Sequence, residues 1–199
     1  MAVLVGKQAP DFTANAVLGN NEIKSITFSE VAKGKYAVVF FYPLDFTFVC
    51  PSELIAFDHR LEEFKKRNVE VIGVSIDSQF THLAWKNTPV EKGGIGQVGY
   101  TLVADIKHEI VKAYDIEAGG GVAFRATFLI DKSGVVQHQY VNNLPLGRNI
   151  DETLRLVDAL QFTEEHGEVC PAGWNKGKAG MKASTAGVAE YLAEHAKSL

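Results

Sequence analysis

A continuous run of β-branched and aromatic residues, Tyr-Ala-Val-Val-Phe-Phe-Tyr at positions 36–42, limits the folds that are open to this chain. Because the run has no polar alternation, it predicts a strand that is buried on both faces of a sheet. After Cys50 the apolar residues recur at helical spacing instead: Leu54, Phe57, Leu61 and Phe64. They predict one amphipathic helix that ends around 65–67. A buried strand that leads into a helix is typical of α/β proteins.

The rest of the chain continues this alternation. Further buried strands are predicted at 69–76 and 101–106, and helices at 79–87, 107–114 and 150–160. The strands predicted at 126–130 and 135–141 flank Asp131-Lys132-Ser133-Gly134, a turn sequence typical of a β-hairpin. This order predicts a central mixed sheet with helices on both faces, an α/β fold of the thioredoxin-like kind. A flavodoxin-like sheet fits the same order almost as well.

The length of the chain, 199 residues and 21.7 kDa, suits one domain with an appendage. After about residue 166 the sequence becomes rich in glycine and loses its apolar periodicity, and a short helix is predicted around 188–197. We therefore expect a thioredoxin-like domain at 1–165 and a C-terminal arm with a short helix at 166–199.

The charge pattern excludes several classes of partner. The chain has 20 Lys and Arg against 24 Asp and Glu, a formal net charge of −4 with both signs mixed along the sequence. It therefore lacks the excess of positive charge that attracts nucleic acid or an anionic membrane. No apolar run reaches the length of a transmembrane helix. The apolar start ends at Lys7 and is too short for a signal peptide, so we expect a cytoplasmic protein.

The chain has two cysteines, Cys50 and Cys170, far apart in the sequence. They form no C-x-x-C pair and belong to no cluster at zinc spacing, so no metal site is expected. A permanent structural disulfide is rare in a reducing cytosol. Two inert buried thiols would be the ordinary interpretation.

The sequence around Cys50 favours a reactive thiol. The predicted strand ends at Tyr42, a loop follows, and Pro51 suits the first turn of a helix, where its missing N–H costs nothing. Cys50 is thus predicted at a helix N-terminus, where free backbone N–H groups and the helix dipole stabilise a thiolate, the nucleophilic form. The alternative is that Cys50 is a small apolar filler and Thr47 a helix cap.

The pattern P-x-x-x-T-x-x-C formed by Pro43, Thr47 and Cys50 resembles the active-site signature of peroxiredoxins. The surrounding FYPLDFTFVCPSE is similar to the typical two-cysteine subgroup, the alkyl hydroperoxide reductase C and thioredoxin peroxidase family. Further similar segments follow along the chain: GKQAPDF, SIDSQFTHLAW, GVAFRATFLID, LPLGRNIDE and HGEVCPAGW.

The resemblance implies a peroxidase that attacks hydrogen peroxide and organic hydroperoxides with Cys50. Thr47 would hold the substrate, and Pro43 would shield the thiolate from solvent. Arg125 would bring a positive charge to the thiolate and the developing oxyanion. Glu53 and Arg148 match positions that orient this charged centre. No cofactor is implied.

The resemblance also assigns Cys170 as the resolving cysteine, which would form a disulfide with Cys50 of a partner subunit. It implies a homodimer, a ring of five dimers above it, and reduction by a thioredoxin-type donor. The loop Gly93-Gly94-Ile95-Gly96 and the pair Tyr191-Leu192 vary from a Gly-Gly-Leu-Gly loop and a Tyr-Phe pair that some members carry, and that make them sensitive to excess peroxide.

Other classes fit less well. Ala56 and Lys176 occupy the places where a tyrosine phosphatase needs arginine, and the glycine-rich segments match neither a phosphate-binding loop nor a dinucleotide fingerprint. A cysteine protease stays open, although the helix-start Cys-Pro context argues against it. Two alternatives from other classes are a thioredoxin-like disulfide reductase, which lacks its C-x-x-C, and a ring-forming holdase chaperone or peroxide sensor.

Overall fold

The computed structural model describes residues 2–199 and divides into two compact units. The first extends to Ile150, and the second runs from Asp151 to Leu199. The second unit begins within helix α6 (Ile150–His166). The predicted boundary between residues 165 and 166 falls in the last turn of this helix. The division into a domain at 1–165 and an arm at 166–199 stays a prediction.

The first unit is built on a seven-stranded sheet with the order β2-β1-β5-β4-β3-β6-β7. Its strands are β1 (Thr13–Val17), β2 (Ile23–Thr27), β3 (Tyr36–Phe41), β4 (Val69–Ser75), β5 (Thr101–Ala104), β6 (Arg125–Ile130) and β7 (Val136–Asn142). The central β3, β4 and β5 are parallel, whereas β6 and β7 on one side and β1 and β2 on the other are antiparallel to their neighbours. The predicted mixed, thioredoxin-like sheet is confirmed, and the flavodoxin-like alternative is wrong because strands of both directions lie beside the parallel centre.

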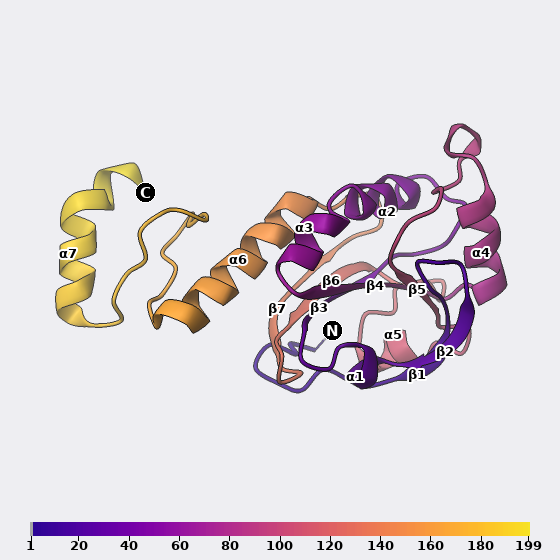
Figure 1. The fold of residues 1–199 in the computed structure, drawn as a ribbon, viewed down its shortest axis with the longest axis horizontal. Coiled ribbons are helices and arrows are strands. Elements are labelled where there is room, and N and C mark those ends of the chain that lie inside the picture. The colour runs from indigo at the N-terminus through magenta and orange to yellow at the C-terminus, as the bar shows by residue number, and fades with distance from the viewer. Residues whose placement is uncertain (1) are drawn as a thin grey trace. The chain divides into compact units, whose positions relative to one another are not determined.

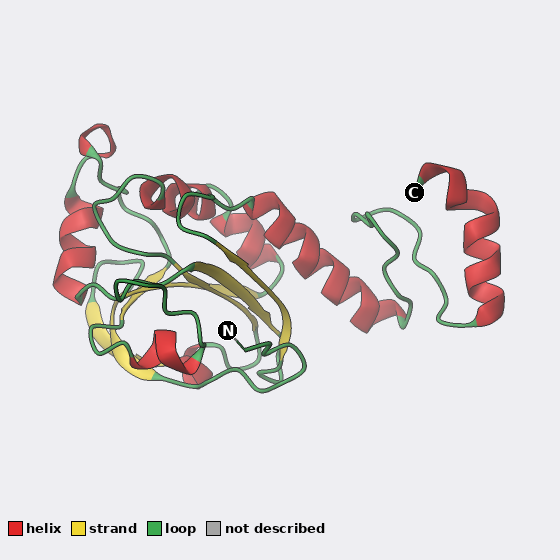
Figure 2. Cartoon of the chain, turned by 180° about the vertical axis from the view of Figure 1, so that it is seen from behind, coloured by secondary structure: helices red, strands yellow, loops and turns green. Residues whose placement is uncertain are grey.

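Helices cover both faces of this sheet. They are α1 (Phe28–Val31), α2 (Cys50–Asp58), α3 (Leu61–Lys66), α4 (Gln79–Asn87), η1 (Val90–Lys92) and α5 (Glu109–Ala113). Figure 1 shows α2 and α3 above the sheet and α1 and α5 below it, and Figure 2 shows the same two layers from behind. The second unit contains the rest of α6, helix α7 (Thr185–His195) and η2 (Ala196–Ser198).

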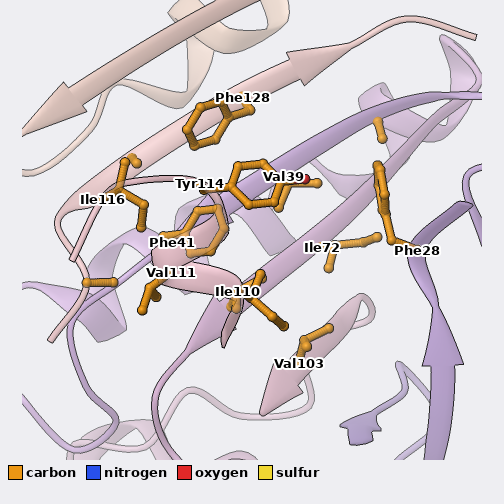
Figure 3. Close-up of a cluster of buried hydrophobic side chains, with 14 of the residues drawn as sticks. Phe28, Val39, Phe41, Ile72, Val103, Ile110, Val111, Tyr114, Ile116 and Phe128 are labelled. Atoms are coloured by element: carbon orange, nitrogen blue, oxygen red, sulfur yellow. The ribbon is translucent and has the colours of Figure 1, made fainter. Parts of the chain in front are cut away.

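The two faces of β3 pack into two cores. Phe40 stacks on Phe57 of α2 with 4.1 Å between ring centroids, while the next residue, Phe41, lies 5.0 Å from the ring of Tyr114 on the other face. Phe128 of β6 joins the second core, which Figure 3 shows in close-up. All six residues of β3 are buried, as its uninterrupted apolar sequence predicted.

One predicted helix was wrong in its length, and one hairpin was not predicted at all. The segment from Cys50 to about residue 66, predicted as one helix, forms two helices, α2 and α3, with a break at Arg60. The backbone N–H of Arg60 donates to Phe57 O, so it does not make the helical bond to Ala56 O. The Arg60 guanidinium donates to Ala56 O in its place, at 3.2 Å. The hairpin of β1 and β2 was missed, since its short strands carry polar residues and little alternation. The predicted β6–β7 hairpin is confirmed: Asp131 Oδ1 accepts from the backbone N–H groups of Ser133 and Val135.

Candidate active site

Cys50 is the first residue of α2 and is completely buried. The chain leaves the centre of the sheet at the end of β3, crosses a loop at 43–49, and enters the helix with Pro51 in its first turn. The first backbone N–H groups of a helix have no partner within it, and they point toward a group at this end. The predicted position of Cys50 at a helix N-terminus is confirmed.

Arg125, the first residue of β6, brings its guanidinium to the sulfur. Its Nη1 lies 3.3 Å from Cys50 Sγ and 2.8 Å from Glu53 Oε2, so one nitrogen donates to both. Its Nε donates to Leu144 O at 2.6 Å, which fixes the plane of the guanidinium. β6 pairs with β3 in antiparallel register, and this places the start of β6 beside the end of β3. Residues far apart in the sequence therefore meet at one point.

Arg148 completes the charged cluster from the loop before α6. Its Nε and Nη2 donate to the two carboxylate oxygens of Glu53 at 2.9 and 2.8 Å, and its backbone N–H adds a third bond at 3.0 Å. The guanidinium carbon also lies 5.1 Å from the centroid of the Phe40 ring. The side chains of Glu53, Arg125 and Arg148 are all nearly inaccessible.

The cluster holds two guanidinium groups against one carboxylate, that of Glu53. Buried charges are costly unless they are paired, and here each guanidinium donates to the Glu53 carboxylate. The interpretation of Cys50 as an inert filler is hard to reconcile with a guanidinium donating directly to its sulfur.

A shallow pocket of about 440 Å³ opens at this point. Its lining is apolar except for one hydroxyl and one guanidinium: Pro43, Thr47, Phe48, Val49, Arg125, Leu144 and Pro145. Thr47 Oγ1 donates to Leu44 O at 2.8 Å, and this leaves its oxygen lone pairs available to accept a hydrogen bond. Val49, without a side-chain hydrogen bond, is the N-cap of α2, so the alternative that Thr47 caps this helix is wrong.

Sequence reasoning missed a buried polar network beneath the same loop. Asp45 accepts from Tyr42 Oη at 2.8 Å and is paired with His82 Nδ1 at 2.7 Å, and its own backbone N–H donates to Asp77 Oδ2 at 2.8 Å. Burial raises the pKa of Asp45 and, more strongly, that of Tyr42. The network ties the active-site loop to β3, to α4 and to the end of β4. Nothing in the spacing of these residues indicated that they would meet.

Cys170 lies in the second unit, on the loop between α6 and α7. It is partly buried, and its Sγ donates to Ala159 O at 3.5 Å. Next to it, Val169 and Met181 exchange two backbone hydrogen bonds of 2.9 Å that close the loop on itself. Both cysteines are free thiols.

Residues 2–199 hold neither a candidate metal site nor a candidate membrane-spanning helix. No three or more His, Cys, Asp or Glu side chains among them are grouped so that they could hold a metal ion. No helix in this part of the chain is both long and apolar enough to cross a membrane.

Comparison with known proteins agrees with this geometry. Residues 5–139 match the AhpC/TSA family, and residues 159–194 match the C-terminal domain of 1-Cys peroxiredoxin. The chain belongs to the AhpC/TSA family of peroxiredoxins. It is therefore a peroxidase, an oxidoreductase.

Individual relatives cover almost the whole peroxiredoxin chain. Alkyl hydroperoxide reductase C of Helicobacter pylori is 58% identical over 198 residues, 99% of this chain and 100% of the relative. Peroxiredoxin-1 of Gekko japonicus is 53% identical over 192 residues, 96% of each chain. The reduced 2-Cys peroxiredoxin of Plasmodium vivax superimposes with a TM-score of 0.94 at 52% identity, covering 96% of this chain and 100% of that one.

Proposed function

We propose that this peroxiredoxin reduces hydrogen peroxide and organic hydroperoxides through Cys50. The observation that carries the proposal is the Arg125 guanidinium, which donates to Cys50 Sγ and to Glu53 at the mouth of the pocket. A planar group with several donors can hold a thiolate and a peroxide oxygen at once. The same charge stabilises the oxyanion as the O–O bond breaks.

The reaction is a nucleophilic displacement on oxygen. The Cys50 thiolate attacks the terminal peroxide oxygen, an S–O bond forms, and the O–O bond breaks. The departing alkoxide or hydroxide takes up a proton to become an alcohol or water, and Cys50 becomes a sulfenic acid. Thr47 Oγ accepts from the peroxide O–H and orients it, the backbone N–H of Cys50 donates to the substrate, and Pro43 closes one side of the pocket against water.

In the second half of the cycle, Cys170 of a partner subunit attacks the sulfenic acid, and a disulfide and water form. A thioredoxin-type protein reduces the disulfide and restores both thiols. A cytoplasmic location belongs to this proposal, because the cycle depends on a reducing thiol system.

The assembly that we propose is a homodimer and, above it, a ring of five dimers. β7 is the outermost strand of its sheet, and an edge strand offers a row of N–H and C=O groups to a second chain. The buried Tyr140 Oη on this strand has no hydrogen-bond partner among residues 2–199. In one relative, a Plasmodium yoelii peroxiredoxin modified at its N-terminus forms an octamer that is described as artifactual.

A coupled assay with thioredoxin, thioredoxin reductase and NADPH tests the division of labour between the cysteines. Cys50→Ser should abolish peroxide consumption. Cys170→Ser should react once per subunit and then stall with thioredoxin, while a small thiol should restore turnover. Full thioredoxin-linked turnover by Cys170→Ser would exclude its resolving role.

Non-reducing denaturing gels test the intersubunit disulfide. Peroxide-treated wild type should run as a dimer, and either serine substitution should remove the doubly linked form. A disulfide-bonded monomer would show that Cys170 reacts within its own subunit.

A holdase chaperone or peroxide sensor is the second candidate, supported by exposed apolar side chains, one of them on the active-site loop. Phe48 is 96% exposed, Phe80 67% and Ile106 56%. Exposed apolar side chains that gather into one patch are typical of protein-binding sites. Suppression of light scattering from a denaturing client, measured with the Cys50→Ser variant as control, separates this function from the peroxidase.

A further inference from the structure

The sulfur of Cys50 has to leave its buried position before a second cysteine can bond to it. Cys50 is completely buried as the first residue of α2. A disulfide brings two sulfur atoms to about 2 Å, and a fully enclosed sulfur has no space for a second one at that distance. In a helix that begins at Cys50, the Leu54 N–H closes the first turn on Cys50 O. The sulfur is therefore exposed only when the turn at 50–53 opens.

The half of α2 that follows this turn is tied to the two residues before β5. Tyr100 Oη donates to Leu54 O at 2.8 Å. The preceding residue, Gly99, donates its backbone N–H to Asp58 Oδ1 at 2.7 Å. One bond thus holds the first residue beyond the opening turn, and the other holds the last residue of the helix.

The Tyr100 hydroxyl is held in place as a donor. The side chain is buried, and its ring stands edge-on to Phe40 and Phe57, with 5.7 and 6.5 Å between the ring centroids. Burial raises the pKa of Tyr100 well above its ordinary value, so the hydroxyl keeps the proton that it donates. A buried hydrogen bond is costly to break because its partners find no water in exchange.

The two halves of α2 are held by different kinds of contact. The first turn is tied by polar groups, among them Arg125 Nη1 at 3.3 Å from Cys50 Sγ. The second half is part of the core: Leu54 and Phe57 are completely buried, and the Phe57 ring stacks on that of Phe40. Opening of the first turn exposes little apolar surface, whereas opening of the second half would expose two large side chains.

We propose that Tyr100 is a positioning residue that stops the opening of α2 at Leu54, so that the first turn unwinds while residues 54–58 stay helical. The inference rests on the proposed disulfide between Cys50 and Cys170, which requires the turn to open. Growth of an existing helix adds one hydrogen bond for each residue that is fixed, whereas a new helix needs a costly nucleus. The part that stays helical is a template on which the first turn forms again after each reduction.

Hydrogen exchange of the backbone amides, resolved by residue in the reduced full-length protein, tests this proposal. Tyr100→Phe removes the hydroxyl and keeps the ring. We expect the amides of residues 55–58 to exchange about threefold to tenfold faster in this variant, because one buried hydrogen bond fewer opposes their opening. The amides of residues 52–54 should exchange as in wild type. Tyr114→Phe is the matched control, since it removes a completely buried hydroxyl that has no hydrogen-bond partner within residues 2–199, and it should leave exchange in α2 unchanged.

The disulfide-linked protein, formed by treatment with peroxide, gives a second measurement. In wild type the amides of residues 52–54 should lose protection while those of residues 55–58 keep it. In Tyr100→Phe the loss should extend to residue 58. The rate at which peroxide oxidises Cys50 should be the same in both proteins, because Tyr100 does not line the pocket beside the sulfur.

Three results would overturn the proposal. Unchanged exchange at residues 55–58 in Tyr100→Phe would show that the hydroxyl does not restrain this half of α2. Equal acceleration over residues 52–58 would show that the helix opens as one unit, without a stop at Leu54. Equal acceleration in the strands of the sheet would show a general loss of stability. The exchange of the reduced protein does not involve Cys170, so a failure of Cys170 as the resolving cysteine would be seen separately, as full thioredoxin-linked turnover of Cys170→Ser.

Discussion

At the scale of single residues, one nitrogen of the candidate active site donates to two acceptors. Arg125 Nη1 donates to both Cys50 Sγ and Glu53 Oε2, and Nε is held by Leu144 O. A lysine ammonium carries the same charge on a flexible stem and cannot reproduce three bonds in one plane. Charge and geometry can therefore be separated experimentally by exchanging arginine for lysine.

We predict that Arg125→Lys slows the oxidation of Cys50 by peroxide at least about tenfold, which corresponds to roughly 1.4 kcal/mol of activation free energy. Stopped-flow fluorescence or competition with a second peroxidase gives this rate. Arg67→Lys, in which the exchanged arginine is paired with Glu63 on α3, should react like wild type. Wild-type kinetics in Arg125→Lys would mean that Arg125 is only an ion-pair partner of Glu53.

At the scale of elements, one position in the turn after α4, Gly94, has no room for a side chain. A Cβ on Gly94 would lie 1.8 Å from Thr88 O, which is a backbone atom and cannot move aside. Indole and backbone bonds hold the surrounding loop: Trp85 Nε1 donates to Gly93 O at 2.8 Å, and Ile95 N donates to Trp85 O at 3.3 Å. We predict that Gly94→Ala lowers the free energy of unfolding by about 1–3 kcal/mol, measured by urea denaturation. Gly119→Ala, where the added Cβ meets nothing within 4 Å, should change it little.

Helix α4 is also joined to the β1–β2 hairpin by a buried lysine. Lys86 Nζ donates to Leu18 O at 2.9 Å and to Gly19 O at 3.3 Å, and burial lowers the pKa of Lys86 from 10.5 to about 8. Between these two values the unfolded chain holds the proton that the folded chain has released, so the contribution of Lys86 to stability rises with pH.

We predict that Lys86→Met removes this gain. The free energy of unfolding of wild type should increase relative to Lys86→Met as the pH is raised from about 8 toward 10.5, measured by urea denaturation at each pH. Lys66→Met, which removes an exposed lysine paired with Glu63, should follow wild type across the series. Parallel profiles for wild type and Lys86→Met would contradict the prediction.

The sequence predicted the elements of this fold where one physical signal dominates. The apolar run at 36–42 predicted β3 correctly, because a strand without polar residues is stable only where both of its faces are buried, at the centre of a sheet. The break at Arg60 was not predictable, because it depends on a side chain that replaces a backbone donor. The contact of Arg125 with Cys50 is produced by the pairing of β6 with β3. The sequence did not reveal that pairing, so the contact was expected only from the family resemblance. The Asp45 network had no such motif, since its members are brought together by three separate elements.

At the scale of the whole molecule, the C-terminal helix carries apolar side chains that its own unit covers only in part. Val188 and Leu192, one helical turn apart, are 36% and 41% exposed, while Tyr191 packs on His195 with 4.5 Å between ring centroids. The family resemblance implies that this helix slows the local unfolding that lets the two cysteines meet. Slower resolution gives a second peroxide molecule time to convert the Cys50 sulfenic acid to sulfinic acid.

We therefore predict intermediate sensitivity to inactivation by excess peroxide. Leucine at 192 buries less surface than an aromatic ring, a difference on the order of 1 kcal/mol, which shifts a local opening equilibrium severalfold. Leu192→Phe should raise the sulfinic fraction formed per turnover, and deletion of residues 188–199 should lower it. Mass spectrometry of the Cys50 peptide during turnover at rising peroxide measures both. Ala193→Ser, a small change on the same helix, is the control and should match wild type. If the truncated protein gave the same sulfinic yield as wild type, the C-terminal helix would have no part in gating this enzyme.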